Sequence, residues 1–187
     1  MKDVLNGTLV RLSALDPEEF SKAFTGWRRD SEFMRLMDSG PIRLGSQKDT
    51  QKWIEKDLDG QDLHEHPFAI RTLAEDKLIG DIGLYVVNWP GRDAFVGLGI
   101  GERDFWGRGY GTDVMKLILS YAFLEINLRR VTLTVFEYNP RAIRSYEKAG
   151  FRHEGRLRKS LQRNGMRYDE LFMGVLREDW LEQNKEH

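Results

Sequence analysis

The positions of apolar side chains along the chain predict about seven strands. In several of these runs apolar and polar residues alternate, which is typical of a strand with one side against a core. The first five predicted strands cover residues 8–15, 67–73, 77–87, 94–101 and 131–137. Asn164-Gly165 then indicates a tight hairpin between the last two strands, because both residues tolerate the left-handed backbone that such a turn needs.

Apolar side chains at helical spacing predict about four helices between the strands. Asp16-Pro17 marks the start of the first helix, since aspartate is a favoured N-cap and proline suits the first helical position. Residues 28–46 are expected to be irregular, and a short helix is expected around residues 50–58. Neither repeats nor low-complexity linkers interrupt this order, so residues 1–187 are expected to form a single α/β domain.

A glycine-rich loop, Trp106-Gly107-Arg108-Gly109-Tyr110-Gly111-Thr112, comes directly before one of the predicted helices. Its glycines leave backbone N–H groups accessible, and the helix start adds unpaired donors and the positive end of the helix dipole. This combination is typical of a phosphate-binding site. The Gly-Lys-Ser/Thr ending of a P-loop and the spacing of a dinucleotide loop are both missing, which argues against a nucleoside triphosphate or NAD.

The strand before the loop, residues 94–101, has glycines on one face and apolar side chains on the other. Glycine packs nothing in a strand, so Gly97, Gly99 and Gly101 indicate either the close approach of a ligand or another backbone, or a bend or bulge. A ligand that reaches both the strand and the phosphate loop would have an extended arm and phosphates at its end. Coenzyme A has that shape.

These two features, with a third, resemble the GNAT N-acetyltransferases. The segment from Trp106 to Gly111 is similar to the family's acetyl-CoA motif Gln/Arg-x-x-Gly-x-Gly/Ala, although Trp106 departs from the usual first residue. The variant Trp-Gly-x-Gly-Tyr is similar to the branch of ribosomal-protein N-terminal acetyltransferases and their small-amine relatives. The block from Asn139 to Phe151 looks like the family's fourth helix. The resemblance implies a mixed, mostly antiparallel sheet of about seven strands with about four helices, splayed between strands four and five.

The resemblance also implies roles for individual residues. The cosubstrate would be acetyl-CoA, with its carbonyl oxygen on backbone N–H groups of the glycine strand, its pyrophosphate on the loop amides and its pantetheine arm against Asn139 and the helix that follows. The implied cofactor-binding residues are Gly99, Ile100, Gly101, Arg108, Gly109, Tyr110, Gly111, Thr112, Asn139 and Ala142. A solvated Arg108 is an equal alternative to a phosphate contact.

Tyr146 is the residue expected to protonate the leaving thiolate. Asn139, Ala142 and Tyr146 lie on one helical face, and a phenol with a pKa near about 10 can donate to a thiolate with a pKa near about 8.5. From the residues alone, Tyr146 could also be a tyrosine that only packs in the core, and it is the family resemblance that favours its role as general acid. In some relatives the candidate general base is a glutamate early in the fourth strand, where this chain has Phe95 and Val96 instead.

The general base is therefore unassigned. Three carboxylates or a water could act instead, and ordinary surface or pairing roles are the alternative for each of them. These carboxylates are Asp81, Glu102 and Glu137.

The amino-acid composition limits the kinds of partner and cofactor that the chain is expected to bind. The chain has 29 basic and 30 acidic side chains, and this near-zero net charge argues against nucleic acid as the main partner. It has no cysteine, so a thiolate metal site and an acyl-cysteine intermediate are excluded, and His64-Glu65-His66 lacks a third nearby ligand. Neither a signal peptide nor a long apolar run is seen, and the expectation is a cytoplasmic protein without membrane contact or metal, as a monomer or homodimer.

Two functions follow from the sequence. The first is an acetyl-CoA-dependent N-acetyltransferase that moves the acetyl group directly to a primary amine: a protein N-terminus, a polyamine or an amino sugar. The second is a catalytically weak acyl-CoA-binding module that uses the same fold for regulation. Tyr146 and Asn139 favour the enzyme, whereas the missing carboxylate on the fourth strand favours the module.

Overall fold

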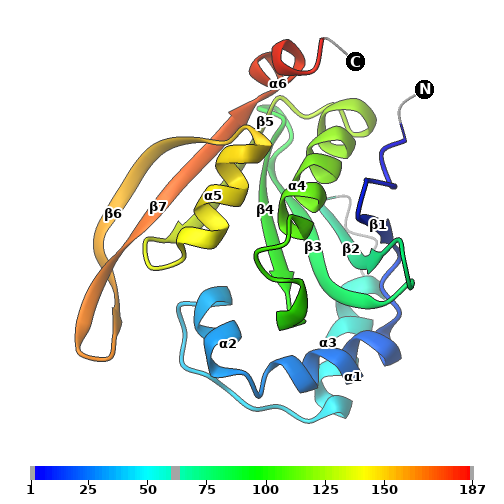
Figure 1. The fold of residues 1–187 in the computed structure, drawn as a ribbon, viewed down its shortest axis with the longest axis vertical. Helices are drawn as coiled ribbons and strands as arrows, with labels where there is room; N and C mark the ends of the chain where they lie inside the picture. Colours follow the sequence, from blue (N-terminus) through cyan, green and yellow to red (C-terminus); the bar gives the residue numbers. More distant parts are fainter. Residues whose placement is uncertain (1–2, 60–63, 186–187) are drawn as a thin grey trace.

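The strands of the chain pair into one sheet, which Figure 1 shows in the computed structural model. The structure describes residues 3–59 and 64–185. Within this part of the chain the sheet has seven strands in the order β1-β2-β3-β4-β5-β7-β6. The strands are β1 (Val10–Ser13), β2 (Glu65–Thr72), β3 (Leu78–Asn88), β4 (Asp93–Ile100), β5 (Arg130–Phe136), β6 (Arg152–Arg163) and β7 (Met166–Leu176). Only β4 and β5 pair in parallel, so the predicted mixed, mostly antiparallel sheet is confirmed.

The described residues contain six α-helices rather than about four. They are α1 (Pro17–Trp27), α2 (Ser31–Met37), α3 (Gln47–Asp59), α4 (Tyr110–Ser120), α5 (Pro140–Ala149) and α6 (Arg177–Gln183), with single turns η1 (Arg103–Phe105) and η2 (Tyr121–Glu125). The expectation that residues 28–46 are wholly irregular was wrong, because α2 lies within them. Asp30 caps α2 by accepting hydrogen bonds from the backbone N–H groups of Glu32 and Phe33, at 2.9 and 3.2 Å.

The two faces of the sheet carry different helices, because neighbouring side chains of a strand point in opposite directions. On one face α4 and α5 cover the larger core, whose fully buried members include Ile70 and Ile118. On the other face a smaller core joins Ala69 of β2 to Phe20 of α1 and Phe33 of α2. Figure 1 shows α4 and α5 in front of the sheet and the segment from α1 to α3 around its lower end.

The parallel pair β4–β5 parts after three residues. Its register runs only from Asp93–Arg130 to Phe95–Thr132, although β4 continues to Ile100 and β5 to Phe136. The sheet is therefore splayed between these strands, as predicted. Backbone groups on the facing edges lose their sheet partners there, next to the start of α4 (Figure 1).

Candidate active site

A cleft of about 370 Å³ occupies the place where β4 and β5 separate. The walls come from these two strands, the glycine-rich loop, α5 and one side of α2. Of the residues predicted to form the site, the lining includes Ile100, Gly109, Gly111, Thr112, Asn139, Ala142 and Tyr146. Residues that are far apart in the sequence thus meet in one cavity.

The glycine-rich loop presents backbone donors to this cleft. Gly107 and Gly109 have φ angles of 70° and 93°, which glycine adopts without strain. Gly109 is the N-cap of α4 and no side chain caps the helix, whose first internal bond runs from the Asp113 N–H to the Gly109 carbonyl at 3.0 Å. The N–H groups of residues 110–112 therefore have no partner within the helix, and they lie at the positive end of its dipole.

Two loop side chains point to neighbours outside this wall. The exposed Arg108 guanidinium donates to the Asp104 carbonyl at 3.1 Å, which fits the solvated alternative. The Tyr110 ring packs edge-on against Phe105, with 4.9 Å between ring centroids. Any contact of these two residues with an anion in the cleft would therefore involve their backbone.

Backbone groups of Gly99, and of Gly101 directly after β4, point toward β3 and away from the splay. The Gly101 N–H donates to the Ile79 carbonyl of β3 at 2.9 Å, and the Gly99 carbonyl lies 1.9 Å from where a Cβ on Gly80 would stand. Backbone N–H and C=O groups alternate between the two edges of a strand, so those of Leu98 and Ile100 point to the gap toward β5 instead.

The Ile100 carbonyl is already taken, because it accepts a hydrogen bond from Trp106 Nε1 at 2.6 Å. This contact involves the carbonyl only, so the Ile100 N–H, within the predicted donor region from Gly99 to Gly101, still faces the gap, and the Leu98 N–H faces it as well.

The missing side chains of these glycines make room for protein rather than for a cofactor. A Cβ on Gly101 would lie 1.9 Å from the Trp27 ring, and one on Gly99 would lie 2.9 Å from the Met37 methyl. Both α1 and α2 thus approach the sheet closely at β4. The glycine pattern indicates close approach of a ligand or another backbone, or a bend or bulge; at these two positions the space is instead taken by side chains of α1 and α2.

Helix α5 brings an amide and a phenol to the cleft. Asn139 is its N-cap, and the side-chain oxygen accepts from the Ala142 N–H at 3.2 Å, which leaves the amide N–H groups for a ligand. Tyr146 is buried against Phe151, and within the described residues its hydroxyl has no hydrogen-bond partner. Burial raises the pKa of Tyr146 to about 12, while the Arg141 charge opposes that rise, so the phenol stays protonated near neutral pH.

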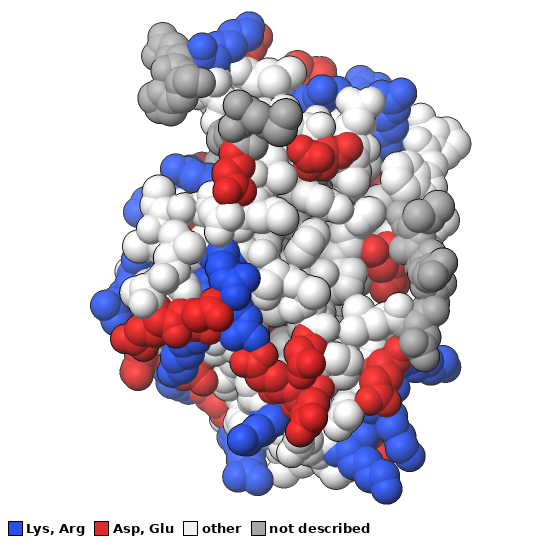
Figure 2. All heavy atoms as spheres, turned by 90° about the vertical axis from the view of Figure 1, so that its right-hand side faces the viewer, with Lys and Arg blue, Asp and Glu red and all other residues white. Residues whose placement is uncertain are grey.

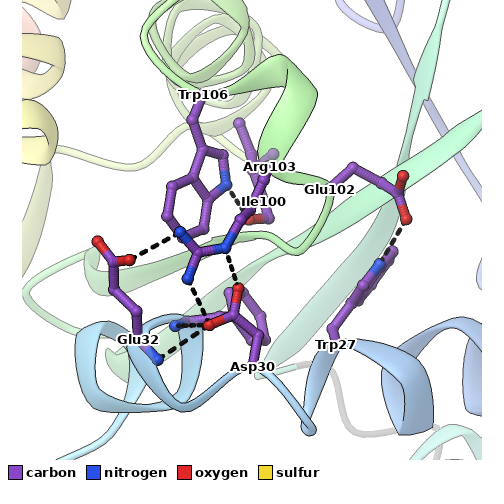
Figure 3. A network of polar contacts seen from close by, with 8 residues as sticks. Trp27, Asp30, Glu32, Ile100, Glu102, Arg103 and Trp106 are labelled. Atoms are coloured by element: carbon purple, nitrogen blue, oxygen red, sulfur yellow. Dashed lines mark hydrogen bonds and ion pairs between the residues drawn. The ribbon is translucent and has the colours of Figure 1, made fainter.

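A polar network ties α2 to the glycine-rich loop (Figure 3). Arg103 bonds Asp30 with Nη2 at 2.7 Å and Glu32 with Nη1 at 2.7 Å. The Trp106 ring stacks under two guanidinium groups, those of Arg103 at 4.9 Å and Arg141 at 3.7 Å from its centroid. Trp106 is thus a structural bridge between the loop, α2 and α5.

The other end of α2 is held by the hairpin. Arg163 Nη2 donates to the carbonyls of Asp38 and Gly40 at 2.8 and 2.9 Å, and the Tyr138 hydroxyl donates to the Arg35 carbonyl at 2.6 Å. Between these anchors the side chains of α2 line the cleft. They are Phe33, Leu36 and Met37. Sequence reasoning missed α2, and the Asp30-Ser31-Glu32 capping pattern was the signal that could have located it.

The three candidate carboxylates differ in their surroundings. Glu102 accepts from Trp27 Nε1 at 2.8 Å and from Lys77 at 2.7 Å, and Glu137 accepts from the Asp169 N–H at 2.8 Å. In Asp81 the Oδ1 atom is buried without a partner. Burial raises the pKa of Asp81 to about 7.

The sequence predicted neither a metal site nor a membrane-spanning segment, and the described residues can be inspected for both. No group of three or more His, Cys, Asp and Glu side chains is placed to hold a metal ion in residues 3–59 and 64–185. His66 instead lies beside Tyr121, with Nδ1 3.2 Å from the hydroxyl. None of the helices in this part of the chain is long and apolar enough to cross a membrane.

Figure 2 shows the face that lies on the right-hand side of Figure 1, and no extended region of one charge sign covers it. Acidic side chains gather mainly in its lower half, with basic side chains beside them and a largely uncharged middle. Recognition of a charged acceptor on this face would therefore depend on single groups rather than on a long-range potential.

The splayed strands, the uncapped helix start and the cleft tyrosine together define the class of the GNAT-type acyltransferase fold. The acetyltransferase (GNAT) domain family matches residues 9–152. Probable N-acetyltransferase YjcK of Bacillus subtilis (strain 168) is 33% identical over 130 residues, covering 69% of this chain and 68% of that protein. Spermidine N(1)-acetyltransferase of Vibrio cholerae is 30% identical, covering 81% of this chain and 96% of that protein.

The fold matches solved structures as well. The crystal structure of spermidine N-acetyltransferase from Vibrio cholerae in complex with CoA and spermine superposes with a TM-score of 0.80 at 24% identity, covering 92% of this chain and 98% of that one. The chain belongs to the GNAT acetyltransferase family and is an N-acetyltransferase.

Proposed function

We propose that the protein transfers an acetyl group from acetyl-CoA directly to a primary amine. One observation carries the proposal: the Tyr146 hydroxyl, which has no partner in the described chain, and the uncapped N-terminus of α4 belong to the same cleft. The helix start suits a pyrophosphate, and the phenol suits a leaving thiolate. The similar crystal structure that contains CoA supports this choice of cosubstrate.

The cleft offers a place for each part of acetyl-CoA. The amides of Gly109, Tyr110, Gly111 and Thr112 would bind the pyrophosphate, and the Arg141 guanidinium at the cleft wall would add positive charge. Asn139 would donate its side-chain amide to the pantetheine arm. The Leu98 N–H, which faces the splay, would donate to the thioester oxygen.

Three groups of the chain would then act on the reaction. The Leu98 N–H stabilises negative charge on the carbonyl oxygen as the amine nitrogen attacks, and Tyr146 gives its proton to sulfur as the C–S bond breaks. Acetyl-CoA supplies the activated acetyl group. The apolar side chains of α2, among them Phe33 and Leu36, cover the cleft and exclude water from the reacting atoms.

The acceptor class is part of the proposal. Relatives include a spermidine N(1)-acetyltransferase, and the solved neighbour is a spermidine enzyme that holds spermine. Polyamines are therefore the first amines to test, followed by peptides with free N-termini and amino sugars. The segment from α2 to Gly40 and the β6–β7 hairpin, joined by Arg163, would determine the choice among them.

Calorimetry with acetyl-CoA, followed by a thiol-release assay over this amine panel, tests the proposal. Binding together with CoA release on one amine class is the expected result. Binding without release on any amine would favour the alternative of a catalytically weak acyl-CoA-binding module, and absence of binding would contradict the phosphate site itself. A variant with Tyr146→Phe separates the two functions further, since only an enzyme should lose turnover while still binding acetyl-CoA.

A further inference from the structure

Asp81 has one carboxylate oxygen, Oδ1, that the packing of the sheet leaves without a hydrogen-bond partner. It lies on β3, and the register places it opposite Ala69 of β2 and Gly99 of β4. The Oδ1 atom is buried and accepts no hydrogen bond, although the residue as a whole is partly exposed. Buried carboxylates are normally hydrogen-bonded or paired, so this one calls for a functional explanation.

The surroundings of Asp81 are uncharged. Ala69, Gly99 and the Met37 side chain face it from β2, β4 and α2, and Tyr85 is the titratable side chain that follows on the same face of β3. Burial alone raises the pKa of Asp81 to about 7, and only its own backbone N–H opposes that shift. A base with a pKa near the working pH is well matched to general-base catalysis.

Two glycines of β4, Gly97 and Gly99, lie between Asp81 and the cleft. A Cβ on Gly99 would stand 3.2 Å from Asp81 Oδ1, and one on Gly97, a cleft residue, would have Tyr85 as its nearest neighbour at 3.7 Å. The Met37 side chain lines the cleft and lies over Gly99. It is the last residue of α2 and 39% exposed, so the flexible thioether has room to turn aside for an amine.

We propose that Asp81 accepts the proton of the acceptor ammonium group on the glycine face of β4. This inference rests on the proposed function. The N–H bond of the ammonium breaks and its proton forms an O–H bond on Asp81, from which it passes to solvent. The freed lone pair forms the N–C bond to the acetyl carbon, the C–S bond breaks with its electron pair on sulfur, and Tyr146 protonates that sulfur. The second nitrogen proton then restores the Tyr146 phenol.

The other two carboxylates considered from the sequence are occupied. Glu102 is held by Trp27 and Lys77, and Glu137 caps the backbone of Asp169. Glu137 therefore supplies a matched control, because Glu137→Gln also exchanges a carboxylate for an amide and keeps the accepting oxygen. Asp81→Asn is the test variant.

The experiment measures kcat/KM between about pH 6 and pH 10 with the best amine of the panel, together with acetyl-CoA affinity by calorimetry. In the wild type kcat/KM should level off above about pH 7, because Asp81 is then ionised and the amine, with a pKa near about 10, still carries its proton. Asp81→Asn should lower kcat/KM about 100-fold near neutral pH.

The pH profile of the variant separates a base from a structural role. Without Asp81 only the free amine reacts, so kcat/KM should rise about tenfold per pH unit up to the amine pKa and approach the wild-type value there. Acetyl-CoA affinity should not change. Glu137→Gln should keep both the wild-type rate and the plateau.

Three results would overturn the inference. An Asp81→Asn variant that keeps the wild-type rate and plateau would show that the proton goes elsewhere, while leaving the transferase intact. Loss of acetyl-CoA affinity in that variant would assign Asp81 a structural role. A wild type that binds acetyl-CoA and acetylates no amine would contradict the proposed function and this inference with it.

Discussion

Asp81 should make the protein less stable as the pH rises, and Asp81→Asn should remove that dependence. An aspartate in an unfolded chain titrates near about 3.9, whereas burial raises the pKa of Asp81 to about 7. The native state therefore holds this proton more tightly than the unfolded state does. The free energy of unfolding consequently falls between about pH 4 and pH 7 and levels off above that range.

The magnitude follows from the same comparison. One pKa unit corresponds to about 1.4 kcal/mol, which gives about 4 kcal/mol as an upper value for full ionisation of Asp81. The residue is partly exposed, so water offsets some of this cost, and the expected penalty is on the order of 2–4 kcal/mol. The asparagine of the variant cannot ionise. The stability of the variant relative to the wild type should therefore increase by this amount between about pH 4 and pH 8.

Urea denaturation followed by tryptophan fluorescence, at intervals of one pH unit, measures the effect. Asparagine introduces an amide of its own, which adds a constant offset, so the change of the difference with pH is the quantity that matters. A difference that stays constant from about pH 4 to pH 8 would refute the reasoning, because Asp81 would then titrate normally in the native state. A stability difference that changes only below about pH 5 would likewise show that Asp81 titrates normally in the native state.

Three further predictions concern the cleft and its supports. Tyr146→Phe should lower kcat about 100-fold or more in the thiol-release assay while the acetyl-CoA Kd stays within about twofold; equal turnover would exclude Tyr146 as the acid. Gly101→Ala should cost about 1–3 kcal/mol in urea denaturation, since its Cβ would lie 1.9 Å from the Trp27 ring, whereas Gly155→Ala, with no atom within 4 Å, should cost less than about 0.5 kcal/mol. Arg103→Gln should raise the acceptor KM about fivefold without changing the acetyl-CoA Kd, because it releases α2 from the loop; an unchanged KM would show that α2 is held without this contact.

The sequence allowed most of the sheet to be predicted because its signals there are local. Alternating apolar residues located the strands, and Asn164-Gly165 located the hairpin, where both residues adopt positive φ angles of 50° and 75°. The glycine-rich loop was recognisable for the same reason, since Gly107 and Gly109 perform their role through their own backbone.

The parts of the site that sequence reasoning missed depend on contacts distant in the chain. Helix α2 is only seven residues long, and its place is fixed by Arg103, which lies 73 residues from Asp30. The role of Trp106 follows from Arg141 stacking on it from α5. Neither a propensity nor a spacing rule encodes such pairings, because they arise only when the sheet brings the two segments together.

The glycines of β4 illustrate how a correct observation led to the wrong partner. Their small size did indicate close approach, but Trp27 and Met37 fill the space at Gly101 and Gly99. The sequence shows that a face is open without showing what covers it. Only the register of β3 against β4 places Asp81 beside Gly99.

The geometry of β4 gives a reason why a base on β3 suits this chain. Along a strand the backbone groups alternate between the two edges, and the side chains alternate between the two faces. In the proposed mechanism the edge toward β5 would offer the Leu98 N–H to the thioester, and the amine would approach from the glycine face of the same strand once the Met37 side chain turns aside. The two substrates would then meet at β4 from different directions. A longer side chain at Gly99 would add to the obstruction that Met37 already presents, whereas a carboxylate one strand away, at Asp81, would reach the nitrogen in this mechanism without standing on β4 itself.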